Sequence, residues 1–302
     1  MNKVVLIGCG NVGMSYAYAL LNQTTPVDTL VLIDINTEKT MGEVMDLNHC
    51  LSYSPSKINI SLGEYKDCKD ADLIVIAAGT NQAPGETRMD LINKNSKIFK
   101  SIIGPVMESG FNGIFLVATN PLDVMTYLTL KYSGLDKSKV IGSGTTLDTS
   151  RLRYMISEKT NINPKDIDAY IIGEHGDSEF ACWSNAVIAN SPITDFISQD
   201  DMKEIEDNVR NSAYEIIKRK GATFYGIGMC LARITKAIFN NESVILPVSS
   251  LDTKHQICIS TPAVVNRDGV MEKIFIPLNP EEEEKLTNSI NVIKNAINSI
   301  NE

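Results

Sequence analysis

Short apolar runs alternate with longer amphipathic segments through the first half of the chain. The runs predict strands at residues 3–7, 29–34, 73–78, 113–118 and 139–141. Helical patterns lie between several of them, for example over residues 12–21 and 37–50. Continuous β-branched strands separated by helices are typical of a parallel sheet that is covered on both faces. The alternation therefore predicts an α/β fold built on a doubly wound parallel sheet.

The second half of the chain follows a different pattern. We expect helices near residues 147–159, 200–218 and 281–301, a strand at residues 169–172, and mixed strands after the helix at 200–218. No linker or low-complexity segment separates the halves, so we expect them to pack closely together. The pattern predicts two domains, one over residues 1–143 and a second, α+β domain over residues 144–302.

Composition limits the classes of partner. The 302 residues include 28 Lys+Arg and 37 Asp+Glu, a net charge of −9, which argues against binding to nucleic acid or to an anionic membrane surface. No apolar stretch reaches the roughly 18 residues of a membrane-spanning helix. The six cysteines are scattered without metal-ligand spacing, as is typical of reduced thiols in a cytoplasmic protein. We therefore expect a cytoplasmic protein without a metal site.

A glycine-rich turn follows the first predicted strand and opens the first predicted helix. Gly8 would allow the tight turn, Gly10 a close approach of a pyrophosphate to the backbone, and Gly13 close packing of helix on strand. Asp34 ends the next strand about twenty residues later, where a carboxylate binds ribose hydroxyls and repels a 2′-phosphate. Separately, these features could be an ordinary turn and an exposed aspartate. Together they predict a Rossmann domain that binds NAD.

One of the three histidines is a candidate for acid–base chemistry. Of the three histidines, His49 and His255 have no distinctive setting, whereas His175 lies between Gly173 and Gly176 directly after a predicted strand. Flanking glycines would free the backbone to expose the ring. A structural, hydrogen-bonded histidine is the alternative interpretation.

Two further groups of polar residues could serve a reaction. Asp148 and Arg151 are three residues apart on a predicted helix and share a face, where they could be a surface ion pair or could orient an imidazole and bind a carboxylate. The polar segment 79–88, which includes Gln82 and Arg88, follows the predicted strand at residues 73–78. It could be a surface connection, but loops at the carboxyl ends of such strands cover the ligand crevice.

These motifs, together with residues 119–123, resemble the lactate/malate dehydrogenase family over nearly the whole chain, and within it the bacterial L-lactate dehydrogenases. The resemblance implies that NAD is the cofactor, that pyruvate and lactate are the substrates, and that the protein is a homotetramer. It also implies that Arg151 binds the substrate carboxylate, that His175 is the acid–base residue, and that Asp148 pairs with the imidazolium and raises its pKa towards neutrality. Arg88 would stabilise charge on the substrate carbonyl oxygen.

The remaining expected site residues also follow from the resemblance. Asn120 and Thr223 would line the substrate pocket, and Ile227 would lie behind the nicotinamide ring. The full expected cofactor set is Gly8, Gly10, Val12, Gly13, Asp34, Gly79, Asn120 and Ile227.

Gln82 occupies the position that faces the substrate side chain in this family. Malate dehydrogenases place an arginine there, so a neutral amide favours pyruvate over oxaloacetate. The alternatives are a malate or branched 2-hydroxy-acid dehydrogenase of the same fold, and a non-catalytic NAD-binding protein. The last is disfavoured because His175, Asp148, Arg151 and Arg88 are all present.

One departure from the family pattern concerns activation. Many bacterial lactate dehydrogenases bind fructose 1,6-bisphosphate at a subunit interface through an arginine and a histidine. Arg153 matches the arginine, but Asp168 stands at the histidine position. Because a carboxylate repels phosphate, we expect weak activation or none.

Overall fold

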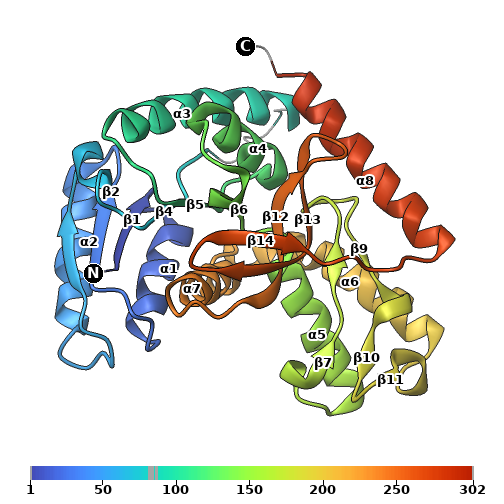
Figure 1. The fold of residues 1–302 in the computed structure, drawn as a ribbon. Helices are drawn as coiled ribbons and strands as arrows, with labels where there is room; N and C mark the ends of the chain where they lie inside the picture. Colours follow the sequence, from blue (N-terminus) through green and yellow to red (C-terminus); the bar gives the residue numbers. More distant parts are fainter. Residues whose placement is uncertain (1, 81–84, 86–87, 301–302) are drawn as a thin grey trace.

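A computed structural model describes residues 2–80, 85 and 88–300. The strands of its main sheet are β1 (Lys3–Ile7), β2 (Thr29–Ile33), β3 (Asn59–Leu62), β4 (Leu73–Ile76), β5 (Ile114–Val117), β6 (Val140–Gly142), β12 (Val244–Asp252), β13 (Ile257–Asn266) and β14 (Gly269–Lys273). Their order in the sheet is β14-β13-β12-β6-β5-β4-β1-β2-β3 (Figure 1). The six strands β3, β2, β1, β4, β5 and β6 are parallel to one another. The sequence predicts a parallel sheet, but β3 is not among the strands expected from it.

Helices cover both faces of this sheet. They are α1 (Asn11–Leu21), α2 (Thr37–Cys50), α3 (Arg88–Glu108), α4 (Leu122–Ser133) and α7 (Tyr225–Phe239). Side chains of β1 alternate between two cores: Val4 and Leu6 pack with α1, α2 and α7, whereas Val5 and Ile7 pack with α3 and α4. The strand order reverses between β1 and β4, and ligands of doubly wound sheets bind at that point, beyond the carboxyl ends of the strands.

The second half of the chain adds a smaller α+β layer. Its helices are α5 (Thr146–Thr160), α6 (Gln199–Lys220) and α8 (Pro280–Asn298), and its short strands are β7 (Ile167–Asp168), β8 (Ile171–Ile172), β9 (Phe180–Ala181), β10 (Val187–Ile188) and β11 (Ser191–Pro192). Short 3₁₀ segments lie at Tyr65–Cys68, Lys137–Lys139, Pro164–Asp166, Trp183–Asn185 and Ile193–Asp195. Among the described helices, none combines the length and apolarity needed to cross a membrane.

Two expectations about the second half are wrong. Of the strand expected at residues 169–172, only Ile171–Ile172 forms a strand, β8, while β7 precedes the expected range and belongs to a different small sheet. The region after residue 218 begins with helix α7 and only then continues into the strands β12–β14. Gly228 of α7 lies so close to α1 that a Cβ atom would come within 2.8 Å of Ser15. This glycine serves close helix packing and is not part of a strand or turn.

The main sheet is shared by the two halves of the chain. Strand β12 from the second half pairs antiparallel with β6, where Ser249 lies opposite Gly142. Helices α1 and α7 also meet, and the Tyr16 and Thr235 hydroxyl oxygens are 2.8 Å apart in the buried contact. These contacts bring the start of α5 and the loop after β8 to the carboxyl edge of the sheet.

Candidate active site

The turn from β1 into α1 contains Gly8, Gly10 and Gly13, and only Gly10 borders space that a ligand could occupy. A Cβ atom on Gly8, whose φ is +103°, would lie 2.3 Å from the Ala78 amide nitrogen, and one on Gly13 would lie 2.0 Å from the Gly8 oxygen. A Cβ atom on Gly10 would meet nothing within 4 Å. Packing inside the protein therefore requires Gly8 and Gly13, while Gly10 borders open space.

Asp34 holds the same turn from the neighbouring strand. Its Oδ2 accepts a hydrogen bond from the Cys9 amide (2.7 Å), and its Oδ1 accepts one from the Asn36 amide (3.0 Å). A carboxylate has about four acceptor sites, so it can still accept from hydroxyl groups. The N-terminus of α1 has no side-chain cap, so its first amides are available to an anion. This donor and acceptor set fits a dinucleotide.

The other expected cofactor residues lie along the same edge of the sheet or beside the turn. Gly79 follows β4, and a Cβ atom there would lie 2.5 Å from Thr119 Cγ2. Asn120 follows β5, and its carbonyl oxygen accepts a hydrogen bond from Asn95 Nδ2 (2.7 Å). Val12 and Ile227 are half-buried and pack against the core between α1 and α7.

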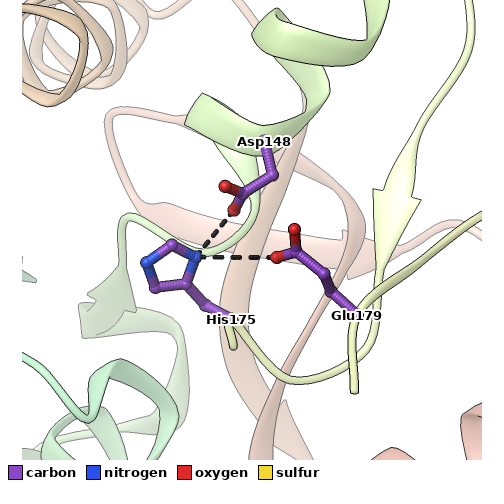
Figure 2. A group of neighbouring side chains, drawn as sticks. All are labelled: Asp148, His175 and Glu179. Atoms are coloured by element: carbon purple, nitrogen blue, oxygen red, sulfur yellow. Dashed lines mark hydrogen bonds and ion pairs between the residues drawn. The ribbon is translucent and has the colours of Figure 1, made fainter. Parts of the chain in front are cut away.

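His175 lies in the loop between β8 and β9, close to the start of α5. Its Nδ1 is 2.6 Å from Asp148 Oδ2, and Arg151 Nη1 donates to the other oxygen of that carboxylate at 2.8 Å (Figure 2 shows the first contact). Asp148 is 1% exposed, whereas the His175 side chain is 24% exposed. The structure thus joins the three polar residues into one hydrogen-bonded group that reaches the surface through the imidazole.

The buried carboxylate controls the charge of the imidazole. Burial by itself lowers the pKa of His175, but the charge and hydrogen bond of Asp148 outweigh it and raise that pKa from 6.5 to about 9. This exceeds the expected rise towards neutrality. Burial also raises the pKa of Asp148, but the opposing effects of His175 and Arg151 leave it below its ordinary value. His175 is therefore an imidazolium at neutral pH beside an ionised aspartate.

Sequence reasoning missed two carboxylic acids of this group. Asp123 of α4 was noted only as part of the 119–123 motif; its Oδ2 accepts from the His175 backbone amide (2.8 Å) and its Oδ1 from Ser249 Oγ (2.6 Å). Glu179 is 5% exposed, and its Oε2 lies 3.9 Å from His175 Nδ1 (Figure 2). Its position four residues after His175, just before an apolar strand, is the signal that could have found it.

The structure describes the remaining expected site residues only in part. Gln82 lies outside the described residues. The backbone of Arg88 begins α3, but its side chain is outside the described part of the structure. Thr223 is half-buried in the connection between α6 and α7.

Asp148, His175 and Glu179 also offer three potential metal-ligand atoms within 4.8 Å of one another. The 2.6 Å between His175 Nδ1 and Asp148 Oδ2 is a hydrogen-bond distance. Two ligands of a tetrahedral zinc ion, each about 2 Å from the metal, would be farther apart than this. The arrangement is that of an acid–base group.

Both halves of the chain match one family. The profile described as "lactate/malate dehydrogenase, NAD binding domain" matches residues 2–142, and "lactate/malate dehydrogenase, alpha/beta C-terminal domain" matches residues 145–302.

Individual proteins with this similarity are L-lactate dehydrogenases. Those of Halalkalibacterium halodurans and Bacillus pumilus are each 54% identical, over 97% of this chain and 96% of theirs. A lactate dehydrogenase from a Medee basin deep-sea metagenome library superposes with a TM-score of 0.96 at 53% identity, covering 99% of this chain and 98% of that one. The ligands-bound minor L-lactate dehydrogenase of Enterococcus mundtii gives a TM-score of 0.96 at 43% identity, with the same coverage.

Proposed function

The chain belongs to the lactate/malate dehydrogenase family, and on this basis we propose how it works as an NAD-dependent L-lactate dehydrogenase. It transfers hydride reversibly between NADH and pyruvate, giving L-lactate and NAD⁺. High identity to curated L-lactate dehydrogenases over nearly the whole chain supports this activity. The observation that carries the mechanism is the hydrogen-bonded group in which Asp148 holds both His175 and Arg151.

The cofactor would lie along the carboxyl edge of the sheet. The open space at Gly10 and the uncapped N-terminus of α1 would receive the pyrophosphate, and Asp34 would accept hydrogen bonds from a ribose. Val12, Gly79, Asn120 and Ile227 would line the remainder, while Gly8 and Gly13 maintain the turn. When bound, NADH supplies the hydride.

His175 would deliver the proton. With Nδ1 bound to Asp148, Nε2 is the ring nitrogen that can face a substrate, so the imidazolium donates from Nε2 to the carbonyl oxygen of pyruvate. Arg151 keeps N–H groups besides the one that binds Asp148, and these would bind the pyruvate carboxylate. Arg88 would stabilise the negative charge that develops on the carbonyl oxygen. In the reverse reaction, the oxidation of lactate, His175 would accept the proton of the lactate hydroxyl group.

The substrate side chain is selected by Gln82 and Thr223. The methyl group of pyruvate needs no charged partner, whereas oxaloacetate would bury a second carboxylate beside a neutral amide. An unpaired buried charge costs about 3–5 kcal/mol, which corresponds to about 10²–10³-fold in rate. Thr223 acts in the same direction, because malate dehydrogenases commonly carry a smaller residue there.

Three broader features belong to the same proposal. We propose a division into an NAD-binding domain over residues 1–143 and a substrate domain over residues 144–302, a homotetrameric assembly, and a cytoplasmic location. The resemblance to the family supports the first two, and the acidic composition with scattered cysteines supports the third. Light scattering of the purified protein tests the assembly directly.

A comparison of substrates tests the proposed specificity. We expect purified protein to oxidise NADH with pyruvate at a kcat/KM at least about 10²-fold above that with oxaloacetate, and above that with 2-ketoisocaproate. A preference for oxaloacetate would identify a malate dehydrogenase, and a preference for 2-ketoisocaproate a branched 2-hydroxy-acid dehydrogenase. Absence of turnover with all three, despite NADH binding, would favour a non-catalytic protein.

A single substitution tests the acid–base residue. His175→Asn removes the transferable proton, so we expect kcat to fall by about 10²–10⁴-fold. NADH affinity, followed by fluorescence titration, should remain close to that of the unmodified protein because the cofactor turn is untouched. Unchanged turnover would remove His175 from the mechanism.

A further inference from the structure

Glu179 is a third carboxylic acid of the site without a role in the reaction described above. It comes directly before β9, is 5% exposed, and its Oε2 lies 3.9 Å from the imidazole Nδ1. An oxygen of Glu179, an oxygen of Asp148 and a ring nitrogen of His175 all lie within 4.8 Å of one another. Asp148 therefore faces three groups: the imidazole, the guanidinium of Arg151, and the carboxyl group of Glu179.

A hydrogen bond between two carboxyl groups requires one proton between them. An ionised carboxylate only accepts hydrogen bonds, so Asp148 and Glu179 cannot both be ionised while they are bonded to each other. Two ionised carboxylates in contact would also repel strongly in a buried site. The burial and proximity of the two carboxyl groups therefore favour one additional proton between them, beyond the proton that His175 would exchange with substrate.

The proton belongs on Glu179. Asp148 is 2.6 Å from the imidazole and 2.8 Å from the guanidinium, and both favour its ionised form. Glu179 is farther from the imidazole and is buried against the negative charge of Asp148. Burial, and then the charge of Asp148, accordingly raise the pKa of Glu179 well above its ordinary value.

We propose that Glu179 is a positioning residue which, as a neutral carboxylic acid, donates a hydrogen bond to Asp148 and so limits how strongly Asp148 holds the proton of His175. The inference rests on the proposed function, in which His175 gives up that proton. A donor to Asp148 stabilises the negative charge of that carboxylate and weakens its attraction for the imidazolium. Because Glu179 is neutral, it adds no second negative charge beside the imidazole.

Other charged and titratable groups around this set come from several elements. Asp123 of α4 accepts a hydrogen bond from the His175 backbone amide, and Arg210 Nη2 of α6 donates one to the Glu179 backbone oxygen (3.5 Å). Glu174 Oε2 accepts a hydrogen bond from Ser178 Oγ (2.5 Å). Cys230 of α7 is close enough to Asp148 for the aspartate charge to raise the pKa of the thiol. Each of these contacts is made without the Glu179 carboxyl group. Changes at that carboxyl group therefore report on its own proton and hydrogen bond.

The pH dependence of pyruvate reduction separates the neutral from the ionised form. Glu179→Gln supplies a neutral amide that can still donate to Asp148. We therefore expect the basic limb, the alkaline pH range over which kcat/KM for pyruvate falls, to stay within about 0.3 pH unit of that of the unmodified enzyme. Glu179→Met keeps the volume but removes the donor, and the limb should move to higher pH by about 0.5–1 unit because Asp148 then holds the imidazolium more strongly.

Either of two results would overturn the proposal. If Glu179 were ionised, Glu179→Gln would remove a negative charge 3.9 Å from the imidazole and lower the limb by at least about one pH unit. If both variants kept the unmodified profile, Glu179 would have no effect on His175. Thermal unfolding of each variant establishes that the profiles belong to folded protein.

An infrared measurement tests the proton of Glu179 without catalysis. The unmodified protein at neutral pH should show the carbonyl stretch of a protonated carboxylic acid, sensitive to deuterium, which disappears in Glu179→Gln. Asp123 is present in both proteins and cancels in the difference spectrum. A difference spectrum that instead loses an ionised carboxylate band would overturn the proposal. This result does not depend on the substrate, so its failure is distinguishable from failure of the proposed activity.

Discussion

At the scale of single residues, the imidazole of His175 is subject to opposing effects. Burial alone favours the neutral ring, whereas the buried carboxylate of Asp148 favours the imidazolium and prevails, raising the pKa to about 9. The ring is therefore charged before pyruvate arrives. In the proposed mechanism, reduction of pyruvate uses this charged form and oxidation of lactate uses the neutral form.

The two directions of reaction should consequently respond to pH with opposite signs. For pyruvate reduction, we expect kcat/KM to be constant at neutral pH and to fall as pH rises through about 9, while lactate oxidation rises over the same range. Asp148→Asn removes the anion and should move the limb down by about two units or more. Profiles measured in both directions on both proteins check this, and an unmoved limb in Asp148→Asn would contradict it.

A second prediction at this scale concerns the choice of dinucleotide. Asp34 lies at the carboxyl end of β2 and would repel a 2′-phosphate, so Asp34→Asn should raise the ratio of kcat/KM for NADPH over NADH by about tenfold. Asp28 lies just before the other end of the same strand, where its carboxylate accepts from the Asn2 amide. Asp28→Asn changes the net charge equally and should leave the ratio unchanged. Equal responses of the two variants would exclude a local effect.

Residue types and spacing left open whether His175, Asp148 and Arg151 form one group, and the resemblance to the lactate/malate dehydrogenase family supplied that prediction. The spacing of Asp148 and Arg151 places them on one helical face, and glycines mark the His175 loop. Asp123 was missed because its bond to the His175 backbone spans 52 residues and depends on how α4 packs beneath the loop. Glu179 was missed because its spacing from His175 is a weak signal, and its burial, which distinguishes it from an exposed glutamate, is visible only in the structure.

At the scale of the elements, the glycines of the first turn have different physical reasons. Gly8 and Gly13 are required because a Cβ atom would collide with backbone atoms, whereas Gly10 faces open space. The sequence pattern already predicts different roles for the three glycines. The packed structure divides them into two that serve the fold and one that is available to a ligand.

This division predicts different consequences of the same substitution. Gly13→Ala places a Cβ atom 2.0 Å from the Gly8 oxygen and should destabilise the protein by about 1–3 kcal/mol or more. Gly10→Ala should change stability by less than about 1 kcal/mol but weaken NADH binding by about tenfold or more. Thermal unfolding without cofactor and fluorescence titration with NADH provide the two readouts. A stable Gly13→Ala protein, or unaltered NADH binding by Gly10→Ala, would contradict the assignment.

The elements of the first half follow from sequence more fully than those of the second. Strands β1, β2, β4, β5 and β6 are continuous apolar runs, and the structure differs from expectation only by one or two residues at their ends. Helix α7 was mistaken for strands because it is rich in β-branched and aromatic residues and contains Gly226 and Gly228. Its helical state depends on packing against α1, and local sequence does not show that contact.

At the scale of the whole molecule, the surface expected to bind a sugar bisphosphate carries its own anion. Arg153 Nη2 lies 3.6 Å from Asp168 Oδ1, its Nε donates to the Ala169 oxygen (3.0 Å), and its guanidinium stacks over the Tyr170 ring at 5.0 Å. The arginine is thus engaged by residues of its own chain. A phosphate group would have to approach the Asp168 carboxylate.

Fructose 1,6-bisphosphate should therefore have little effect on the enzyme. We expect the half-saturating pyruvate concentration to change by less than about twofold when the sugar bisphosphate is added. Asp168→His replaces the anion with a group that can bind phosphate and should increase the response. Pyruvate saturation curves with and without the effector, at constant ionic strength, check this. A large shift of the unmodified enzyme to lower pyruvate concentration would show that the carboxylate does not prevent binding.

The pairing of β12 with β6 also affects how this chain can be divided. The two family profiles meet between residues 142 and 145, which marks an obvious position to cut or recombine the gene. A fragment ending there would leave β6 as an open edge strand, with unpaired backbone groups able to recruit other chains into aggregates. Such a fragment needs a cover for β6 that its own sequence lacks. In a chimera made from two relatives, β12 of one relative would have to pair with β6 of the other. The two halves can be told apart in the sequence, but the main sheet needs strands from both.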